Sequence, residues 1–328
     1  MTDDELEKAT ASRELTWLLT TLTDTLQSVR TGLQECLTLL DPSGPSSTLA
    51  LSSSRSEALK GIIHRSGSSI TRGDIQLKLY GLPYSRGGYK LCLAGADKAA
   101  TGDAEELVLE QLVDVRNCVV TSLDLVGGLG SRGNEKKKEG GGTHVPGDAA
   151  NVLRRLRELK ENVGAAKAAL KGQSAHRLWP YYGADPKIFD PPLPQSLAFD
   201  LYISEAAIVV EVRSIEHIPD ASDPSSSKGA FSAVQSLGTS ISSPFGFRER
   251  FAAAVGFSGH PGYHETQAGV GEVFDYQGER VKVKDSVKVE SQDPSLMAVW
   301  AKLGGVEHVL SGAVKSLEVV MTAAGIKC

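Results

Sequence analysis

The chain has 328 residues, of which 41% are hydrophobic, and a formal charge of −5 at pH 7. That hydrophobic fraction supports a folded core in one large or two modest domains. The formal charge gives no reason to expect nucleic acid or an anionic membrane as a general partner. The four cysteines (Cys36, Cys92, Cys118 and Cys328) are widely spaced, which predicts free thiols in a reducing compartment.

The first residues of the chain and the length of its apolar runs favour a cytoplasmic protein. No apolar run reaches the roughly 18 residues that a transmembrane helix needs. The first five residues are polar and acidic, unlike a secretory signal. We therefore expect no integral membrane segment.

The first 40 residues carry the clearest periodic pattern. Apolar residues step along them mostly in alternating fours and threes, which predicts a helix with one narrow apolar seam. The sequence Asp-Pro-Ser-Gly-Pro at 41–45 is expected to end this helix. The seam consists of Leu15, Leu19, Leu22, Leu26, Val29 and Leu33, followed by Leu37 and Leu40.

Three further segments have helical periodicity, over about 103–126, 148–171 and 294–323. The first has its seam at Leu109, Leu112, Arg116, Val119, Leu123 and Val126. The second is expected to start at a capping Asp148, with its seam at Val152, Leu156, Leu159, Val163, Ala166 and Leu170. The third has Leu296, Val299, Leu303, Val306, Leu310, Ala313, Leu317 and Val320. An isolated helix is marginal in water. We therefore predict an antiparallel four-helix bundle domain from residues 1–45, 100–175 and 292–328, with the first and last helices as neighbours.

Strand patterns lie between the helices, around 62–63, 75–79, 89–93, 197–203, 207–217 and 281–289. They predict a separate antiparallel sheet, in a β-domain made from residues 55–98 and 190–291, and hence an α+β fold. Residues 46–56 are a Ser-rich linker in this interpretation. Residues 127–147 and 218–271 are expected to be flexible loops. The Pro- and aromatic-rich residues 177–195 are expected to form an ordered strap without regular structure.

Two motifs resemble chemical sites, and we interpret both as loops. Residues 128–133 match Gly-x-Gly-x-x-Gly, but a predicted helix precedes them where a phosphate-binding loop needs a strand. His260 and His264 are four residues apart, but Pro261 and Gly262 between them argue against a metal-binding helix. We therefore predict no catalytic, cofactor-binding or metal site and no cofactor. A triad assembled in space stays open, because triads are not local in sequence.

The heptads also permit a DNA-binding leucine zipper, which needs a basic helix at the N-terminal end of the zipper. Nothing basic precedes the first or the last helix, so we predict no nucleic-acid partner. The predicted helix over about 148–171 carries Arg154, Arg155, Arg157 and Lys160, which form either a solvated face or a partner-binding face for an acidic protein. Packing inside one bundle is favoured over self-dimerisation for all the seams.

Several segments together resemble a known family. Residues 14–19, Glu-Leu-Thr-Trp-Leu-Leu, resemble the Glu-x-x-Trp-Leu-Leu opening of the Rogdi leucine-zipper family. Four further matches follow in the family's order: residues 74–79, 111–117, 193–203 and 288–290. The matches run from residue 14 to about 320. Residues 127–147 and 218–271 look like insertions.

The resemblance implies an elongated helical bundle joined to a β-domain, and a role in assembling the vacuolar-type proton ATPase. The family includes the smaller accessory subunit of the RAVE complex, the regulator of the ATPase of vacuoles and endosomes. The implied partners are a large WD-repeat scaffold subunit, a Skp-type adaptor in fungal complexes and the peripheral sector of the ATPase. The implied location is cytoplasmic, with peripheral recruitment to vacuolar or endosomal membranes.

The resemblance carries no catalytic residues over to this chain. The function expected from the sequence is therefore that of a non-enzymatic adaptor or scaffold. Two alternatives stay open. One is a homodimeric coiled-coil structural protein. The other is an unrecognised enzyme whose site uses the strap at 177–195 and the loop at 218–271.

Overall fold

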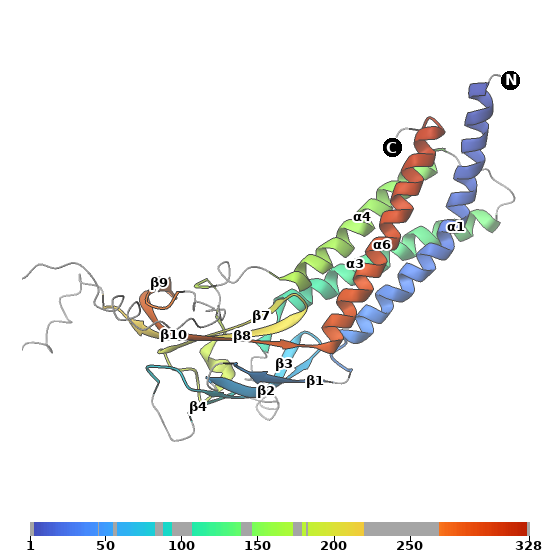
Figure 1. Ribbon diagram of the computed structural model, residues 1–328. Coiled ribbons are helices and arrows are strands. Elements are labelled where there is room, and N and C mark those ends of the chain that lie inside the picture. Colours follow the sequence, from blue (N-terminus) through green and yellow to red (C-terminus); the bar gives the residue numbers. More distant parts are fainter. Residues whose placement is uncertain are drawn as a thin grey trace, which may run out of the picture.

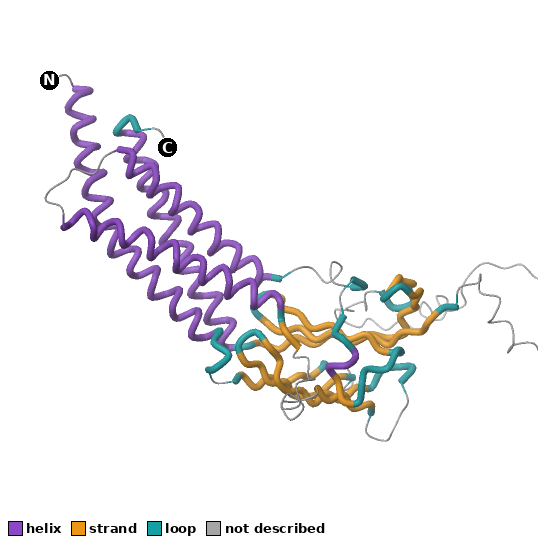
Figure 2. Tube along the Cα trace, turned by 180° about the vertical axis from the view of Figure 1, so that it is seen from behind, coloured by secondary structure: helices purple, strands orange, loops and turns teal. Residues whose placement is uncertain are grey.

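The computed structural model describes residues 3–44, 46–54, 58–82, 88–93, 107–138, 146–172, 179–181, 183–219 and 269–326. The molecule is elongated, with a stalk of helices at one end and two β-sheets at the other (Figure 1). The same division into a helical and a strand-rich half is visible from behind (Figure 2). The predicted α+β class is confirmed.

The stalk consists of α1 (Asp3–Leu39), α3 (Glu110–Lys138), α4 (Pro146–Lys171) and α6 (Pro294–Ala323). Each helix contacts two others: α1 packs on α3 and α6, and α4 packs on the same two helices. Neighbouring helices run antiparallel, and both ends of the chain lie at the tip far from the sheets (Figure 1). Helices from opposite ends of the sequence, α1 and α6, thus lie side by side.

Each of the four predicted seams is displaced by one residue at one position or more. In α1 Cys36 is buried in place of Leu37, and in α6 Val314 is buried in place of Ala313. Leu153 is buried in α4 where the strict repeat favoured Val152, which is only half-buried. Val115 is buried in α3, and Arg116 is exposed. The cause is geometric, because a straight helix with 3.6 residues per turn drifts away from a strict seven-residue repeat.

The predicted loop over 127–147 is wrong for most of its length. The α3 helix continues to Lys138, so the Gly-x-Gly-x-x-Gly sequence lies within a helix, and α4 already begins at Pro146. Glycines are tolerated in a helix when tertiary packing supports it, and residues 135–138 (Glu-Lys-Lys-Lys) are strong helix formers. Residues 139–145 lie outside the described residues, as do 220–268 of the second predicted loop.

The strands form two antiparallel sheets where a single sheet was expected. The first has the order β1-β2-β3-β4-β6, with β5 paired to β3; the second has the order β7-β8-β10-β9. The first sheet contains β1 (Ser47–Ser52), β2 (Leu59–Ser66), β3 (Ser69–Leu77), β4 (Tyr89–Leu93), β5 (Leu107–Val108) and β6 (Phe189–Asp190). The second contains β7 (Leu197–Ser204), β8 (Ala207–His217), β9 (Val273–Tyr276) and β10 (Glu279–Gln292).

Three smaller expectations are also corrected. The Ser-rich residues 47–52 form β1 and are not a linker, because Leu49 and Leu51 alternate into the core between polar neighbours. The helix predicted over about 103–126 is α3, which starts at Glu110 and not near 103, because Leu107 and Val108 form β5. The strap at 177–195 contains a short 3-10 helix, Pro186–Ile188, and the two-residue β6.

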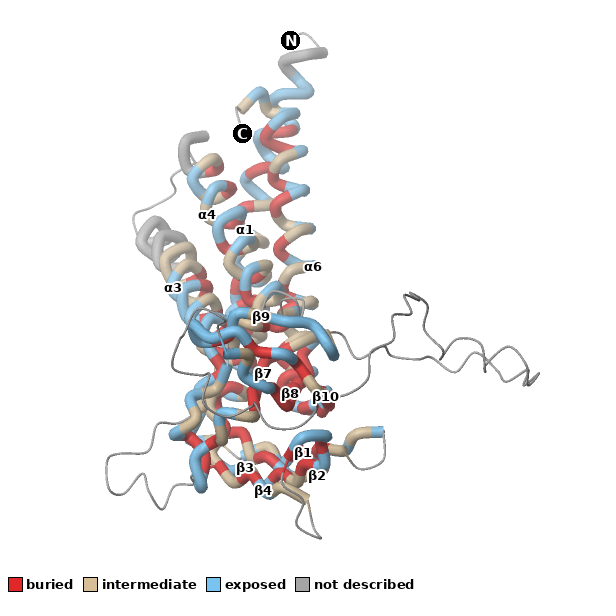
Figure 3. Tube along the Cα trace, turned by 90° about the vertical axis from the view of Figure 1, so that its left-hand side faces the viewer, coloured by how far each residue is buried: buried red, intermediate tan, exposed pale blue. Residues whose placement is uncertain are grey.

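A single cluster of contacting buried side chains runs from the stalk into both sheets. It includes Leu33 of α1, Leu77 of β3, Phe199 of β7 and Leu303 of α6, each with an exposed fraction of 0%. Figure 3 shows buried residues along the inner sides of the helices and through the sheets. The predicted assignment of residues to a bundle domain and a β-domain stays a prediction.

A buried ion pair joins the helices to both sheets. Asp293 follows β10, is 0% exposed and caps α6 by accepting from the Ser295 backbone N–H at 2.8 Å. The same oxygen, Oδ1, accepts from the Ser47 hydroxyl of β1 at 3.3 Å, and the other oxygen, Oδ2, accepts from Arg65 Nε of β2 at 2.5 Å. Arg65 also donates to the Gly67 carbonyl. The Asp293 carboxylate therefore holds the first turn of α6 in place relative to both sheets.

A second joint holds α3 and α4 to the edge of β7. The Gln111 side chain of α3 donates to the Ile203 carbonyl at 3.0 Å and accepts from the Ile203 N–H at 2.6 Å, as a neighbouring strand would. Gly172 ends α4 with φ of +79°, and a Cβ there would lie 2.0 Å from the Ile203 carbonyl oxygen. The edge of β7 is therefore covered by the stalk.

Charged substitutions in the seam are expected to unfold the stalk. Leu26→Asp and Leu310→Asp each bury an unpaired carboxylate, which should cost at least about 4 kcal/mol of unfolding free energy. Val319→Asp is the matched control on α6, because Val319 is 61% exposed. Thermal melts by circular dichroism measure the difference. Wild-type melting of both seam variants would show that the seams are not core.

Loss of the buried carboxylate is expected to loosen the junction between helices and sheets. Asp293→Ala removes the cap of α6 and leaves the Arg65 guanidinium buried without its counter-ion, at a cost of about 3–5 kcal/mol. Glu290→Ala, on an exposed position of the same strand, should change stability by less than about 0.5 kcal/mol. Urea titration compares the two variants, and equal stabilities would contradict this role for Asp293.

Candidate functional site

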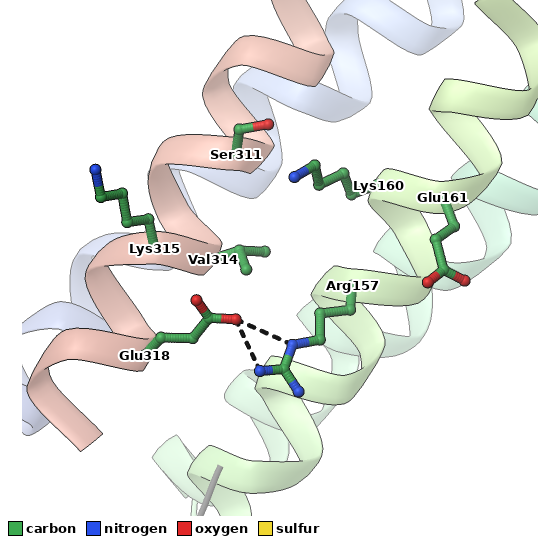
Figure 4. Close-up of a pocket in the computed structure, with 7 residues that line it drawn as sticks. All are labelled: Arg157, Lys160, Glu161, Ser311, Val314, Lys315 and Glu318. Carbon is green, nitrogen blue, oxygen red and sulfur yellow. Dashed lines mark hydrogen bonds and ion pairs between the residues drawn. The ribbon is translucent and has the colours of Figure 1, made fainter. Parts of the chain in front are cut away.

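An open groove lies between α4 and α6 on the outside of the stalk (Figure 4). Its volume is about 660 Å³. It is lined by Arg157, Lys160 and Glu161 of α4 and by Ser311, Val314, Lys315 and Glu318 of α6. Charged side chains and one hydroxyl surround a small apolar floor, a combination suited to binding a charged group.

Ion pairs between α4 and α6 lie at two levels of this helix pair. Arg157 donates two hydrogen bonds to Glu318 Oε1, at 3.1 and 2.7 Å. Two to three turns further along α4, Lys167 donates to Glu307 at 2.5 Å, with its Nζ 5.7 Å from the centre of the Trp300 ring. The two pairs align the helices, although half-exposed pairs of this kind contribute little to stability.

The three arginines of the predicted partner-binding face differ in their surroundings, and their role as a binding face stays a prediction. Arg154 is exposed, and Arg157 is bound to Glu318. Arg155 is half-buried and reaches α3, where a Cβ on Gly128 would lie 2.9 Å from its Nη1. The sequence did not indicate that residues 157–161 and 311–318 line one groove, because they come from helices about 150 residues apart.

The predicted seam residues form the interior of the stalk. Leu22, Leu37, Leu123, Val152 and Ala313 are half-buried, and Arg116 is exposed. The buried seam residues include Leu15, Leu19, Leu26, Val29, Leu33, Leu156, Leu159, Val163, Leu303, Val306, Leu310 and Leu317. Their apolar faces are therefore used within one chain.

A buried charge cluster occupies the second sheet on the side away from the main core. Arg213 of β8 is paired with Asp200 of β7 and, at 2.5 Å, with Glu211 of β8. The Tyr202 hydroxyl lies 3.4 Å from Glu211. All four residues are more than nine-tenths buried. One guanidinium thus serves two carboxylates.

Aromatic side chains cover this cluster. The ring of Trp179 lies 4.5 Å from Arg213 Cζ and stacks on Tyr276 of β9 at 4.8 Å between ring centres. Phe274 meets the same indole edge-on at 5.8 Å. A cation–π contact in a site withdrawn from water strengthens the hold of the strap on the sheet.

Burial changes the proton affinity of the cluster. It raises the pKa of Asp200 to about 7; Arg213 opposes this shift, and Glu211 adds to it. Burial also raises the pKa of Tyr202, with Glu211 contributing. Asp200 Oδ1 and Trp179 Nε1 are buried without a hydrogen-bond partner. The sequence signal for this cluster was only the alternation of Glu211 and Arg213 with valines, and pairing across strands cannot be read from it.

The cysteines of the described residues are free thiols: Cys36, Cys92 and Cys118. This confirms the predicted free state for these three, and Cys328 lies outside the described residues. Burial raises the pKa of Cys36 to about 11, so it stays a thiol and is a poor nucleophile.

Most residues in the family-like segments have structural roles. Ile75, Leu77 and Leu79 are buried on the first sheet, and Gln111 binds the edge of β7. Trp17 is different, because 64% of this tryptophan is exposed on the outer face of α1.

A family model described as Rogdi leucine zipper containing protein matches residues 14–318. The chain belongs to the Rogdi leucine zipper family. The match includes all four helices and both sheets. No curated protein matches the sequence. Membership of the Rogdi family indicates a role in protein–protein interaction.

The described residues contain neither a membrane-spanning helix nor a cluster of metal ligands. No helix among them is both long enough and apolar enough to cross a membrane. In the same ranges, no group of three His, Cys, Asp or Glu side chains is arranged to hold a metal ion. His260 and His264 lie outside these ranges.

The Asp200 cluster should make stability depend on pH near neutrality. The folded state keeps the Asp200 proton up to about pH 7, whereas the unfolded chain releases it near the ordinary value of 3.8. The folded state therefore binds more protons over this window, and its stability falls as pH rises through it. Between pH 5 and pH 8, this effect should lower the unfolding free energy of the wild type by about 2–3 kcal/mol. Asp200→Asn should not show this fall, because its side chain does not titrate.

Urea titrations at pH 5 and pH 8 measure this slope. Asp275→Asn, on exposed β9, is the control and should keep the wild-type slope. An unchanged slope in Asp200→Asn would contradict proton uptake at this carboxylate.

Proposed function

We propose that this chain is a non-enzymatic adaptor that promotes assembly and reassembly of the vacuolar-type proton ATPase, as the accessory subunit of a RAVE-type complex. The observation that carries the proposal is the Rogdi family match over residues 14–318. The sequence motifs that resemble this family imply the same role. In this role the chain acts by binding proteins, and it contributes no catalytic group or cofactor of its own.

The architecture supports an adaptor. Long helices hold the tip of the stalk far from the sheets, so the two ends of the molecule offer separate surfaces (Figure 1). The outer face of the stalk carries the exposed Trp17, and Leu6 on the same helix is 51% exposed. Exposed tryptophans are common energetic centres of protein interfaces.

The proposed partners are the large WD-repeat scaffold subunit, a Skp-type adaptor and the peripheral sector of the ATPase. The proposed location is cytoplasmic, with recruitment to vacuolar or endosomal membranes through these partners. The homodimeric coiled-coil alternative has less support, because the apolar seams are buried within one chain.

Co-purification from the native cell tests this function. The tagged full-length chain is expected to bring down a WD-repeat scaffold and subunits of the peripheral ATPase sector, identified by mass spectrometry. Deletion of its gene should slow vacuolar reacidification after the ATPase has dissociated. Light scattering of the purified chain should give a monomer at micromolar concentration.

The control is the tag expressed alone in the same cell. Recovery of neither the scaffold nor ATPase subunits, together with normal reacidification in the deletion strain, would remove the proposal. A stable dimer in solution would favour the coiled-coil alternative.

A further inference from the structure

We propose that His217 is a proton-operated latch, which holds residues 183–195 of the strap against the hairpin of β9 and β10 while its imidazole ring carries two protons. This inference goes beyond the proposed function, because it concerns a change of conformation and needs no partner. It rests on the contacts that the two nitrogens of one ring make.

His217 ends β8 and contacts two other segments through its ring. Nε2 lies 3.0 Å from the Gln195 carbonyl oxygen of the strap, and Nδ1 lies 2.5 Å from Glu279 Oε2 at the start of β10. Glu279 pairs with Tyr276 across the two-residue turn between β9 and β10. This hairpin lies at the end of the second sheet that is far from the stalk (Figure 1). One ring therefore joins the strap to the hairpin.

Both partners of the ring accept hydrogen bonds and donate none. A neutral imidazole has a proton on only one nitrogen, whereas an imidazolium has a proton on each. A carbonyl and a carboxylate are therefore both bound only by the imidazolium form of His217. Loss of one proton would leave a nitrogen lone pair facing an oxygen, and that contact would be released.

The latch should open as pH rises. The closed state holds one more proton than the open state, so the closed fraction falls with increasing pH. Histidine is the side chain whose charge ordinarily changes between about pH 5 and pH 8. The His217 side chain is 37% exposed, so protons reach the ring from the solvent without unfolding of the sheet.

The other ionisable groups on the surrounding elements do not replace this contact. On β9 the phenol of Tyr276 stays protonated, because burial raises its pKa. On β8 the nearest charged side chain of the same face is Arg213, which is held by the buried carboxylates beside it. In the strap, Asp185 and Lys187 are exposed. Glu279 of β10 is the ionic partner of the ring, and it favours the imidazolium form.

The latch closes a small pocket between the strap and the second sheet. The pocket has a volume of about 100 Å³, and its lining includes His217 and Glu279. Most of the remaining lining is apolar: Pro186, Leu193, Pro194, Leu197 and Tyr276. Release of the ring would therefore widen an apolar pocket.

Backbone bonds confine the movement to one segment. The Ala184 N–H donates to the Phe199 carbonyl at 2.9 Å, and the Ile215 N–H donates to the Ser196 carbonyl at 2.9 Å. Neither bond involves a titratable group, so both persist when the latch opens. The part of the strap that is released lies between them, at residues 185–195.

Hydrogen exchange of the full-length chain, followed by mass spectrometry, tests the latch. Peptides over residues 185–197 contain the amides of Ile188, Leu193 and Leu197, which donate to carbonyls of the same segment. After correction for the intrinsic effect of pH on exchange, wild type should lose protection here by at least about fivefold between pH 5 and pH 8. His217→Gln cannot carry the second proton and should show the low protection at both pH values.

His308→Gln is the matched control, because His308 is exposed on α6 in the stalk, and this variant should keep the wild-type change. Asp200→Asn should keep it too. Circular dichroism melts first establish that all variants fold. Equal protection of wild type at both pH values, or a change that persists in His217→Gln, would overturn the inference. Loss of the change in Asp200→Asn would assign it to the buried charge cluster and also overturn the latch.

Nitrogen-15 spectra of the full-length chain labelled at histidine observe the ring itself. The His217 signals are those that disappear in His217→Gln, and both of its ring nitrogens should be protonated wherever the strap is protected. A neutral His217 ring at a pH where the strap is protected would contradict the latch. None of these outcomes depends on recovery of ATPase subunits, so the latch and the proposed function can fail separately.

Discussion

The buried carboxylate of Asp293 is the constraint on which the arrangement of the molecule depends. It ends the last strand of one sheet, starts the last helix and holds Arg65 of the other sheet. A paired charge in the interior is costly to form and more costly to break, so such a pair specifies geometry more than it adds stability. Here it fixes the direction in which α6 leaves the sheets. Because α6 packs on α1 and α4, this single direction orients the stalk.

The residues that carry the family resemblance mostly serve this framework. Residues 74–77 of β3 supply buried side chains to the first sheet, and the Gln111 side chain binds the backbone at the edge of β7. Motifs of this kind report a shared fold. The residues that the framework does not use include Trp17 on the outer face of the stalk.

The sequence predicted the parts of the fold whose cause is local. The bounds of α6 follow from Pro294 and an unbroken apolar stripe, and β7 and β8 follow from their alternation. It failed where packing overrides composition, as at the glycines of α3 and the serines of β1. The groove and the Arg213 cluster could not be predicted, because each joins side chains from elements whose register is set only by folding.

The length of the stalk acts as a spacer between attachment points. The groove begins about 10 residues before the end of α4, so a helical rise of 1.5 Å per residue holds it roughly 15 Å from the sheets. A protein bound to the stalk at that height would contact the helices and not the sheets. The number of helical turns would then set the distance between two proteins bound at the two ends of the molecule.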